Sequence, residues 1–316
     1  MHIYREHFHS SHQHARLLFK QSIQIVEIEV SSYCNRVCSF CPNSYLDRRT
    51  HRNYIDDQLF LSILGQLREI DYAGSFRIHR YNEPLSNRTY ALGRIRQIKE
   101  HLPKSFVYIH TNGDYLNRSY VDELQTAGVG GMRASAYSPK EIFDPLEMEA
   151  LLRDRVDRLG FPYAMGAWDN IIYADVNTGG DMAFTYAATD FLRERNGTVA
   201  ASSRGGALGI NGSYERVSPC VTPFREFHVE WDGTVMPCCH LRSDVQAHRG
   251  AQMTKLTSDS NIFEEWSKGA FVDWRRQMIR AGRKAGPCLT CNFNEIPEKQ
   301  EVQSFFDAAA AYADNL

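Results

Sequence analysis

The sequence predicts an α/β fold in which parallel strands alternate with helices, followed by a smaller part built around a β-hairpin and a helix. Over residues 23–137, short runs rich in isoleucine, valine and phenylalanine alternate with longer segments whose apolar residues recur at helical spacing. Further along, Asp232-Gly233 separates two apolar runs, which is a strong hairpin signal. Alternating strands and helices are typical of β-α-β units, whose ligand sites lie at the carboxyl ends of the strands.

The first part of the chain is expected to contribute four strands and three helices. We expect strands over residues 23–30, 76–79, 106–110 and 132–137. We expect helices over residues 56–70, 89–102 and 119–127. Gly128 follows the last of these helices in a position suited to a C-cap. A loop with three cysteines, Asn82-Glu83 and Asn112-Gly113 each follow an expected strand, so we expect all three to lie on one rim.

The rest of the chain is less regular. We expect a helix over residues 146–159, a strand over 171–176, a helix over 185–195, hairpin strands over 227–231 and 234–236, and a helix over 274–280. A glycine-rich run at residues 203–206 precedes the last segment. We therefore expect a polar, histidine-rich tail over residues 1–22, an α/β domain over 23–210, and a small domain over 211–316 that ends in a helix.

Composition excludes several classes of protein. The formal net charge of the 316 residues is −2, which leaves no basic stripe for a nucleic acid. No run is long and apolar enough to span a membrane, and the first residues lack the apolar core of a secretory signal, so we expect a cytoplasmic protein. In such a protein, eight cysteines are better explained as metal ligands than as disulfides.

Cys34, Cys38 and Cys41 place three thiolates in one short loop without a fourth. Iron–sulfur cubanes are usually held by four cysteines, so three would leave one iron free to bind a small molecule. Half of a zinc site is the alternative. A second set comes from separate segments around the hairpin: Cys220, Cys238, Cys288 and Cys291. These four indicate a second metal site, for which zinc is again an alternative on ligand chemistry.

Both cysteine sets together resemble a known enzyme family. The loop from Cys34 to Cys41, with the aromatic Phe40 before its last cysteine, resembles the signature loop of radical S-adenosylmethionine enzymes. The pattern Gly233-x4-Cys238 followed by Cys288-x2-Cys291 resembles the shortened auxiliary domain, called twitch, of the SPASM group. The resemblance covers residues 23–291. It implies a partial (β/α) barrel, S-adenosylmethionine, two [4Fe–4S] clusters and an external electron donor of the flavodoxin or ferredoxin type.

The resemblance also implies roles for individual residues. Cys34, Cys38 and Cys41 would hold the radical cluster, and Cys220, Cys238, Cys288 and Cys291 the auxiliary cluster. The family's glycine-glycine-glutamate motif, which grips the methionine amino group, falls on Tyr81-Asn82-Glu83, where the glutamate is kept and both glycines are missing. Asn82 and Glu83 are therefore expected at the cofactor. Ser135 and Arg204 are candidates for its ribose and carboxylate, with a strand end and a solvated arginine as the structural alternatives.

Cys239 is left over beside Cys238, and either of the two adjacent cysteines could be the cluster ligand. The glycine-x4-cysteine spacing favours Cys238, which leaves Cys239 as a buried apolar residue or as a thiol that gives hydrogen to a substrate radical. If Cys239 returns hydrogen to the opposite face of the carbon, the reaction is an epimerisation.

The length and cluster spacing resemble the epimerases and dehydrogenases of aminoglycoside pathways. Only 22 residues precede the first expected strand, which favours a small molecule over a peptide bound through a leader domain. We therefore expect hydrogen abstraction from a sugar, aminocyclitol or aminoglycoside, with an epimerase as the main hypothesis and a dehydrogenase as its rival. A peptide-modifying maturase is a third hypothesis, and a zinc-stabilised binding module is the non-enzyme hypothesis. Loop carboxylates that could bind an amino group are Asp114, Glu141, Asp144, Asp169 and Asp181.

Overall fold

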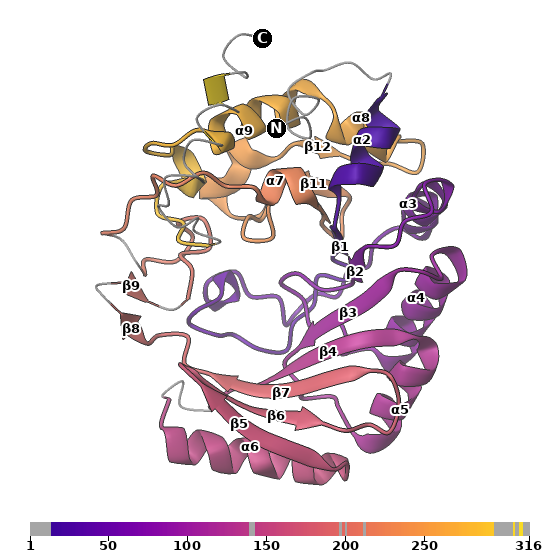
Figure 1. Cartoon of the computed structure of the whole chain (residues 1–316), viewed down its shortest axis with the longest axis vertical. Coiled ribbons are helices and arrows are strands. Elements are labelled where there is room, and N and C mark those ends of the chain that lie inside the picture. The colour runs from indigo at the N-terminus through magenta and orange to yellow at the C-terminus, as the bar shows by residue number, and fades with distance from the viewer. Residues whose placement is uncertain are drawn as a thin grey trace. The chain divides into compact units, whose positions relative to one another are not determined.

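A computed structural model describes residues 14–138, 143–195, 198–199, 201–210 and 213–293, together with Phe306, Ala310 and Ala311 (Figure 1). The chain divides into two compact units. The first unit combines Met1–Glu27, Ile55–Tyr72 and Ser202–Leu316, and the second combines Ile28–Tyr54 and Ala73–Ala201. Strand β1 (Ile25–Ile28) runs from the first unit into the second.

The second unit is built on a mixed sheet. Its strands, in spatial order, are β2 (Ser75–Arg77), β3 (Phe106–Thr111), β4 (Val129–Ala136), β7 (Ala183–Thr189), β6 (Ile171–Val176) and β5 (Tyr163–Trp168). The first four are parallel, and β6 and β5 continue the sheet as antiparallel strands (Figure 1). The predicted α/β fold with parallel strands is confirmed. The polar loops that form the candidate site follow the carboxyl ends of these strands.

Three long helices accompany this sheet: α4 (Arg88–His101), α5 (Arg118–Ala127) and α6 (Pro145–Leu159). The side chains of Asn87, Asn117 and Asp144 accept hydrogen bonds from backbone N–H groups in the first turns, which satisfies donors that the helices cannot pair themselves. Gly128 ends α5 at a φ of 100°, as its sequence position predicts. Helix α6 packs on β4, β6 and β7, and α4 packs on α5.

The first unit contains a four-stranded part of the sheet, in the order β12 (Thr254–Lys255), β11 (Thr234–Met236), β10 (Glu226–Val229) and β1. Its helices are α2 (Ala15–Ser22), α3 (Asp57–Glu69), α7 (Thr222–Arg225), α8 (Ile262–Trp266) and α9 (Gly269–Ile279). The predicted hairpin is present as β10 and β11. Gly233 turns it at a φ of 86°, where a Cβ would lie 2.6 Å from the Leu256 carbonyl oxygen, so only glycine fits.

Several expectations are wrong. The polar tail expected over residues 1–22 gives way from Ala15 to helix α2, whose buried Phe19 makes edge-to-face contacts with Phe227, Phe263 and Trp266 at 5.5, 5.2 and 5.4 Å between ring centroids. The unit boundary lies at residue 202 rather than near 210, and residues 55–72 belong to the same unit as the C-terminal segment. The expected C-terminal helix falls mostly outside the described residues.

The helix expected over residues 185–195 is also wrong, because Ala183–Thr189 is strand β7. Its alanines favour a helix, but hydrogen bonding to β4 on one side and β6 on the other overrides that propensity. Strand β5 was not predicted.

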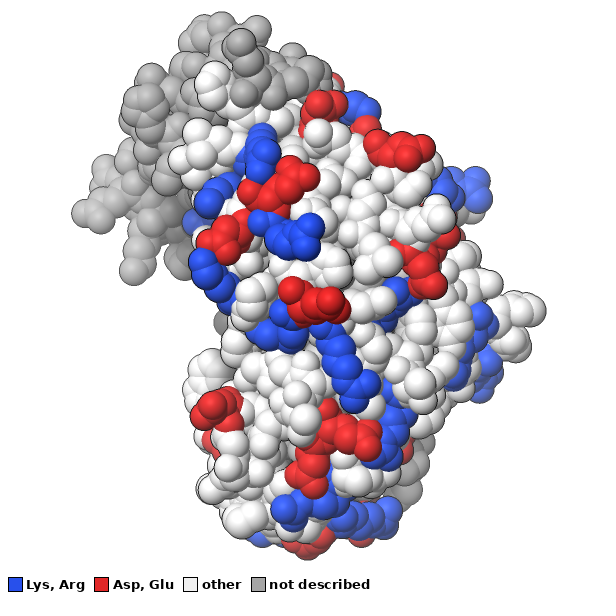
Figure 2. Space-filling view, turned by 90° about the vertical axis from the view of Figure 1, so that its right-hand side faces the viewer, with Lys and Arg blue, Asp and Glu red and all other residues white. Residues whose placement is uncertain are grey.

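No helix in the described part of the chain is long and apolar enough to cross a membrane. On the face shown in Figure 2, basic and acidic side chains alternate rather than gather by sign, as a net charge of −2 leads one to expect.

Candidate functional site

The loop with Cys34, Cys38 and Cys41 lies in the second unit, and all three side chains are half-buried. The Cys41 N–H donates to the Cys38 carbonyl at 3.0 Å, and a 3₁₀ turn, η3 (Pro42–Ser44), begins directly after Cys41. Burial raises the pKa of the Cys34 thiol to about 12. A bound cation is therefore needed to hold this sulfur as a thiolate at neutral pH, which fits a metal-ligand role.

A buried ion pair holds the two ends of this loop together. Arg48 Nη1 lies 2.6 Å from Glu29 Oε1, and both side chains are almost completely buried. The Cys34 N–H donates to the Arg48 carbonyl, and the Tyr81 N–H donates to Glu29 Oε1 at 3.1 Å. The pair therefore links the strand before the cysteines, the chain after them and the turn before Glu83.

Glu83 lies in the same unit and is only 2 % exposed. Its carboxylate accepts hydrogen bonds from the Leu85 N–H, the Thr111 hydroxyl and the Asn112 N–H at 3.0, 2.7 and 2.7 Å. Burial nevertheless raises the pKa of Glu83 to about 7, against the effect of these donors. A buried carboxylate of this kind is stabilised by a cationic partner such as an ammonium group.

Asn82 has a local role in the structure. Its Oδ1 accepts the Arg80 N–H at 2.9 Å and so closes the turn that leads into Glu83. The expected role of Asn82 as a direct cofactor contact stays a prediction.

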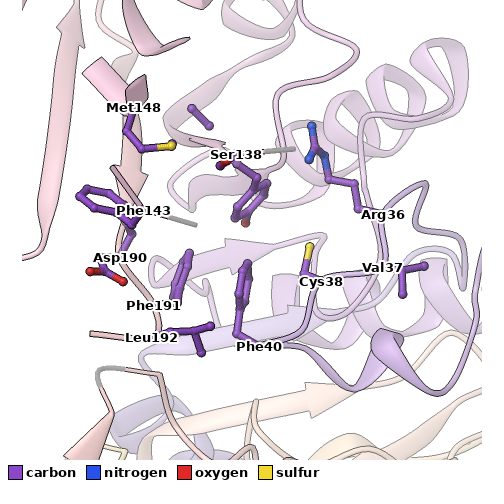
Figure 3. Close-up of a pocket in the computed structure, with 13 residues that line it drawn as sticks. Arg36, Val37, Cys38, Phe40, Ser138, Phe143, Met148, Asp190, Phe191 and Leu192 are labelled. Atoms are coloured by element: carbon purple, nitrogen blue, oxygen red, sulfur yellow. The ribbon is translucent and has the colours of Figure 1, made fainter. Parts of the chain in front are cut away.

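An aromatic cavity opens beside the cysteine loop (Figure 3). It has a volume of about 150 Å³, and Cys38 is one of its lining residues. Phe40 stacks on Phe191 with 4.3 Å between ring centroids, and Tyr137 lies 5.5 Å from Phe40. Aromatic side chains beside a half-buried thiol line a cavity that suits a flat ring such as adenine. Of the three rings, the sequence indicated only Phe40.

Ser135 and Arg204 were also candidates for the cofactor, and these roles stay predictions. The Ser135 side chain is hydrogen-bonded to Tyr137, which lines the cavity. Ser135 is not among the residues that line the cavity; it pairs with Ala187 of strand β7. Arg204 belongs to the first unit, not to that of the cysteine loop. Its Nη1 lies 3.3 Å from His240 Nε2, and His240 Nδ1 lies 2.7 Å from the Ser202 hydroxyl. Because a guanidinium only donates, Nε2 accepts, and Nδ1 carries the proton toward Ser202.

The other cysteines meet in the first unit. One small cavity is lined by all four of the predicted auxiliary ligands, Cys220, Cys238, Cys288 and Cys291. Cys239 is not one of the residues that line it. Burial raises the pKa of Cys220 and Cys288, the latter to about 12. Four thiols around one cavity form a donor set that a cubane cluster or a tetrahedral zinc ion would satisfy.

Cys239 faces a buried cluster that the sequence analysis missed. Its sulfur and ligand atoms of Glu226 and His228 lie within 4.8 Å of one another. His228 Nδ1 lies 3.1 Å from Glu27 Oε1, and Nε2 lies 2.9 Å from Glu226 Oε2. Burial lowers the pKa of His228, but the two carboxylates outweigh it and raise this pKa to about 9. The i, i+2 spacing of Glu226 and His228 on one strand was the only available signal.

Three of the predicted loop carboxylates have structural partners, and Asp169 is one of them, with Arg193 Nη1 3.5 Å from its Oδ1. Asp114 forms a two-bonded ion pair with Arg36 at 2.6 Å, and Asp144 caps helix α6. Glu141 lies outside the described residues.

Comparison with known proteins supports the two-part interpretation. The SPASM family, an iron–sulfur cluster-binding domain, matches residues 220–292. The S-adenosyl-L-methionine-dependent 2-deoxy-scyllo-inosamine dehydrogenase of Niallia circulans is 24% identical over 281 residues, which are 88% of this chain and 96% of that protein.

Two solved structures share the fold. The crystal structure of BtrN in complex with AdoMet and 2-DOIA has a TM-score of 0.61 at 22% identity and covers 88% of this chain and 96% of that one. BtrN in an open conformation has a TM-score of 0.53 at 19% identity and covers 89% and 97%.

The fold, the two cysteine sets and these matches point to one class of enzyme. The predicted resemblance to radical S-adenosylmethionine enzymes with an auxiliary domain of the SPASM or twitch type is confirmed, and S-adenosylmethionine and iron–sulfur clusters are the cofactors that the matches support. Within that class, the predicted resemblance to the aminoglycoside-pathway group is confirmed by the relative from Niallia circulans.

Proposed function

We propose that this enzyme oxidises a carbinol carbon of an aminocyclitol or a related amino sugar to a ketone. The observation that carries the proposal is the meeting of Cys220, Cys238, Cys288 and Cys291 around one cavity, together with a dehydrogenase relative that aligns over 88% of the chain. An alcohol becomes a ketone by losing one hydrogen atom, one proton and one further electron. The four cysteines would hold the acceptor for that electron.

The second unit supplies the groups that would bind S-adenosylmethionine. Cys34, Cys38 and Cys41 would hold an iron–sulfur cluster through three thiolates, so that one iron would be available to the cofactor. Glu83 would accept the cofactor's ammonium group, which relieves the cost of burying its carboxylate. Phe40 and Phe191, which stack on each other, would form an aromatic wall of the cavity against which the adenine packs. Bound in this way and given one electron from the external donor, S-adenosylmethionine would supply a 5′-deoxyadenosyl radical able to remove a hydrogen atom from the substrate carbon.

Epimerisation with Cys239 as hydrogen donor is the second candidate. One observation favours it: the Cys239 sulfur lies beside His228 and Glu226, outside the cavity of the other four cysteines. The relative is a dehydrogenase, however, so the comparisons favour the first candidate over the epimerase that the sequence analysis preferred.

One experiment separates the two candidates. The anaerobically reconstituted enzyme is supplied with S-adenosylmethionine, a flavodoxin or ferredoxin reductant and a panel of aminocyclitols in heavy water. A dehydrogenase forms ketone and 5′-deoxyadenosine in equal amounts, places no deuterium on the carbon that carried the alcohol, and retains this activity in Cys239→Ala. An epimerase returns an inverted alcohol that carries deuterium and loses that product in Cys239→Ala while still cleaving the cofactor. The dehydrogenase proposal is refuted if the second pattern is found.

A further inference from the structure

We propose that Asn112 and Asp114, in the loop after strand β3, are positioning residues that couple the shape of the cysteine loop to Glu83. The inference rests on the proposed function, because it takes Cys34, Cys38 and Cys41 as the radical-cluster ligands and Glu83 as the residue that binds the ammonium group. All of these residues belong to the second unit.

Asp114 anchors the part of the loop between the first two cysteines. Its Oδ2 accepts from Arg36 Nε at 2.6 Å and from Asn35 Nδ2 at 2.8 Å, and its Oδ1 accepts from Arg36 Nη2 at 2.6 Å. Arg155 Nη2 lies 3.3 Å from the same Oδ1. The Arg36 and Asp114 side chains are 23% and 20% exposed, so these charge-assisted bonds are only weakly screened by water. One carboxylate thus orients both residues that follow Cys34.

Asn112 connects the same segment to Glu83. Its backbone N–H donates to Glu83 Oε2 at 2.7 Å, and its side-chain Nδ2 donates to Asn35 Oδ1 at 2.7 Å. Its Oδ1 accepts the Asp114 N–H at 3.0 Å. An unbroken path of short hydrogen bonds therefore runs from the Glu83 carboxylate through Asn112 to the residue next to Cys34.

Arg36 extends this network to the aromatic cavity. Its guanidinium carbon lies 5.2 Å from the centre of the Tyr137 ring, and both residues line the cavity. Figure 3 labels Arg36 and Phe40 among the lining residues. Asp114 fixes this guanidinium through two parallel bonds, a geometry that a neutral amide cannot reproduce. Loss of the Asp114 charge should therefore disturb the cysteine loop and the wall of the cavity together.

The consequence is a reciprocal coupling between two parts of one binding site. A ligand that draws the Glu83 carboxylate toward itself pulls on Asn112, and Asn112 holds Asn35. Thermodynamic linkage makes the effect reciprocal. If the shape of the cysteine loop changes the affinity for the cofactor, then binding of the cofactor changes the preferred shape of the loop by the same free energy. The network is a set of discrete bonds between named atoms, so each connection can be removed separately and the coupling measured.

The test uses the reconstituted holoenzyme and two variants, Asp114→Asn and Arg36→Gln, which break the same ion pair from opposite sides. Asp122→Asn is the matched control, because Asp122 lies on the next helix and makes only an exposed pair with Arg118. Iron content, the affinity for S-adenosylmethionine and the electron paramagnetic resonance spectrum of the reduced enzyme are measured with and without S-adenosylmethionine.

Both variants are expected to keep their iron. They should bind S-adenosylmethionine about tenfold more weakly, which is the usual effect of removing a residue that hydrogen-bonds to a metal ligand's surroundings. The change that S-adenosylmethionine causes in the electron paramagnetic resonance spectrum should also be smaller than in the wild type. Combining Asp114→Asn with Glu83→Gln should cost less affinity than the two single losses together, which a merely structural role would not produce. Wild-type affinity and spectra in both variants would overturn the inference while leaving the proposed function intact. If adding S-adenosylmethionine leaves the electron paramagnetic resonance spectrum of the wild-type enzyme unchanged, the proposed function itself is overturned, and the inference with it.

Discussion

Replacing Arg48 with methionine should destabilise the protein strongly, because it leaves the Glu29 carboxylate buried without its counter-charge. The Arg48 and Glu29 side chains are 7% and 1% exposed, and their charged atoms lie 2.6 Å apart. At an effective dielectric constant of ~20, that separation corresponds to about 6 kcal/mol of attraction, most of which desolvation offsets. Removing one partner of a buried pair costs about 3–5 kcal/mol. We expect the free energy of unfolding to fall by that amount in Arg48→Met.

The double variant Arg48→Met/Glu29→Gln tests the cause of this loss. Glutamine removes the stranded charge and keeps an oxygen that can accept the Tyr81 N–H. We therefore expect the double variant to recover about 2 kcal/mol relative to Arg48→Met alone. A loss caused only by cavity formation would not be recovered in this way.

The assay is urea unfolding followed by tryptophan fluorescence under anaerobic conditions. Arg49→Met is the control, because Arg49 pairs with Asp47 at the exposed surface and its loss should leave the unfolding midpoint unchanged. Iron content is measured alongside, since Arg48 also accepts the Cys34 N–H through its carbonyl. This explanation, a Glu29 carboxylate buried without its counter-charge, is refuted if Arg48→Met has the same unfolding midpoint as Arg49→Met. It is also refuted if the losses in free energy of unfolding of Arg48→Met and Glu29→Gln simply add in the double variant.

Three side chains at the two sites, Phe191, Glu83 and His228, each allow a separate test. Phe191→Ala should weaken binding of S-adenosylmethionine by at most about tenfold, the worth of one aromatic pair, without loss of iron. Equilibrium binding checks this, with Leu146→Ala at an exposed position of helix α6 as the control, and unchanged affinity would contradict the adenine assignment. Burial raises the pKa of Glu83 to about 7, so its carboxylate ionises as the pH rises through that value. The affinity for S-adenosylmethionine should therefore increase between pH 6 and 8 in the wild type but not in Glu83→Gln, and a parallel increase in the variant would exclude Glu83 as the residue that binds the ammonium group. Burial lowers the pKa of His228, but Glu27 and Glu226 raise it from 6.5 to about 9, so the stabilisation by this imidazolium is complete below pH 6.5 and is lost as the pH rises through 9. The free energy of unfolding of the wild type should fall by on the order of 3 kcal/mol over that range. Unfolding of His228→Gln measured over the same pH range should lack this loss.

Features encoded within a few neighbouring residues could be predicted from the sequence. The three cysteines of one loop, the turn at Asp232-Gly233 and the C-cap at Gly128 depend on residue type and spacing alone. The four auxiliary cysteines were grouped correctly around one cavity because the hairpin fixes the position of Cys238. Glu83 was identified through its motif, but its buried network of donors was not.

Contacts between distant residues were decided by the tertiary structure. Residues 55–72 join the C-terminal segment, and Ala183–Thr189 becomes a strand between β4 and β6, because packing and sheet hydrogen bonds outweigh the weak local preferences of those residues. His228 bonds to Glu27 across 201 positions, and Asp114 bonds to Arg36 across 78. No spacing rule connects such pairs. The sequence by itself determined which chemistry the chain can carry, and the fold decided which side chains surround it, because only the folded chain brings charges so far apart in sequence out of water and into contact.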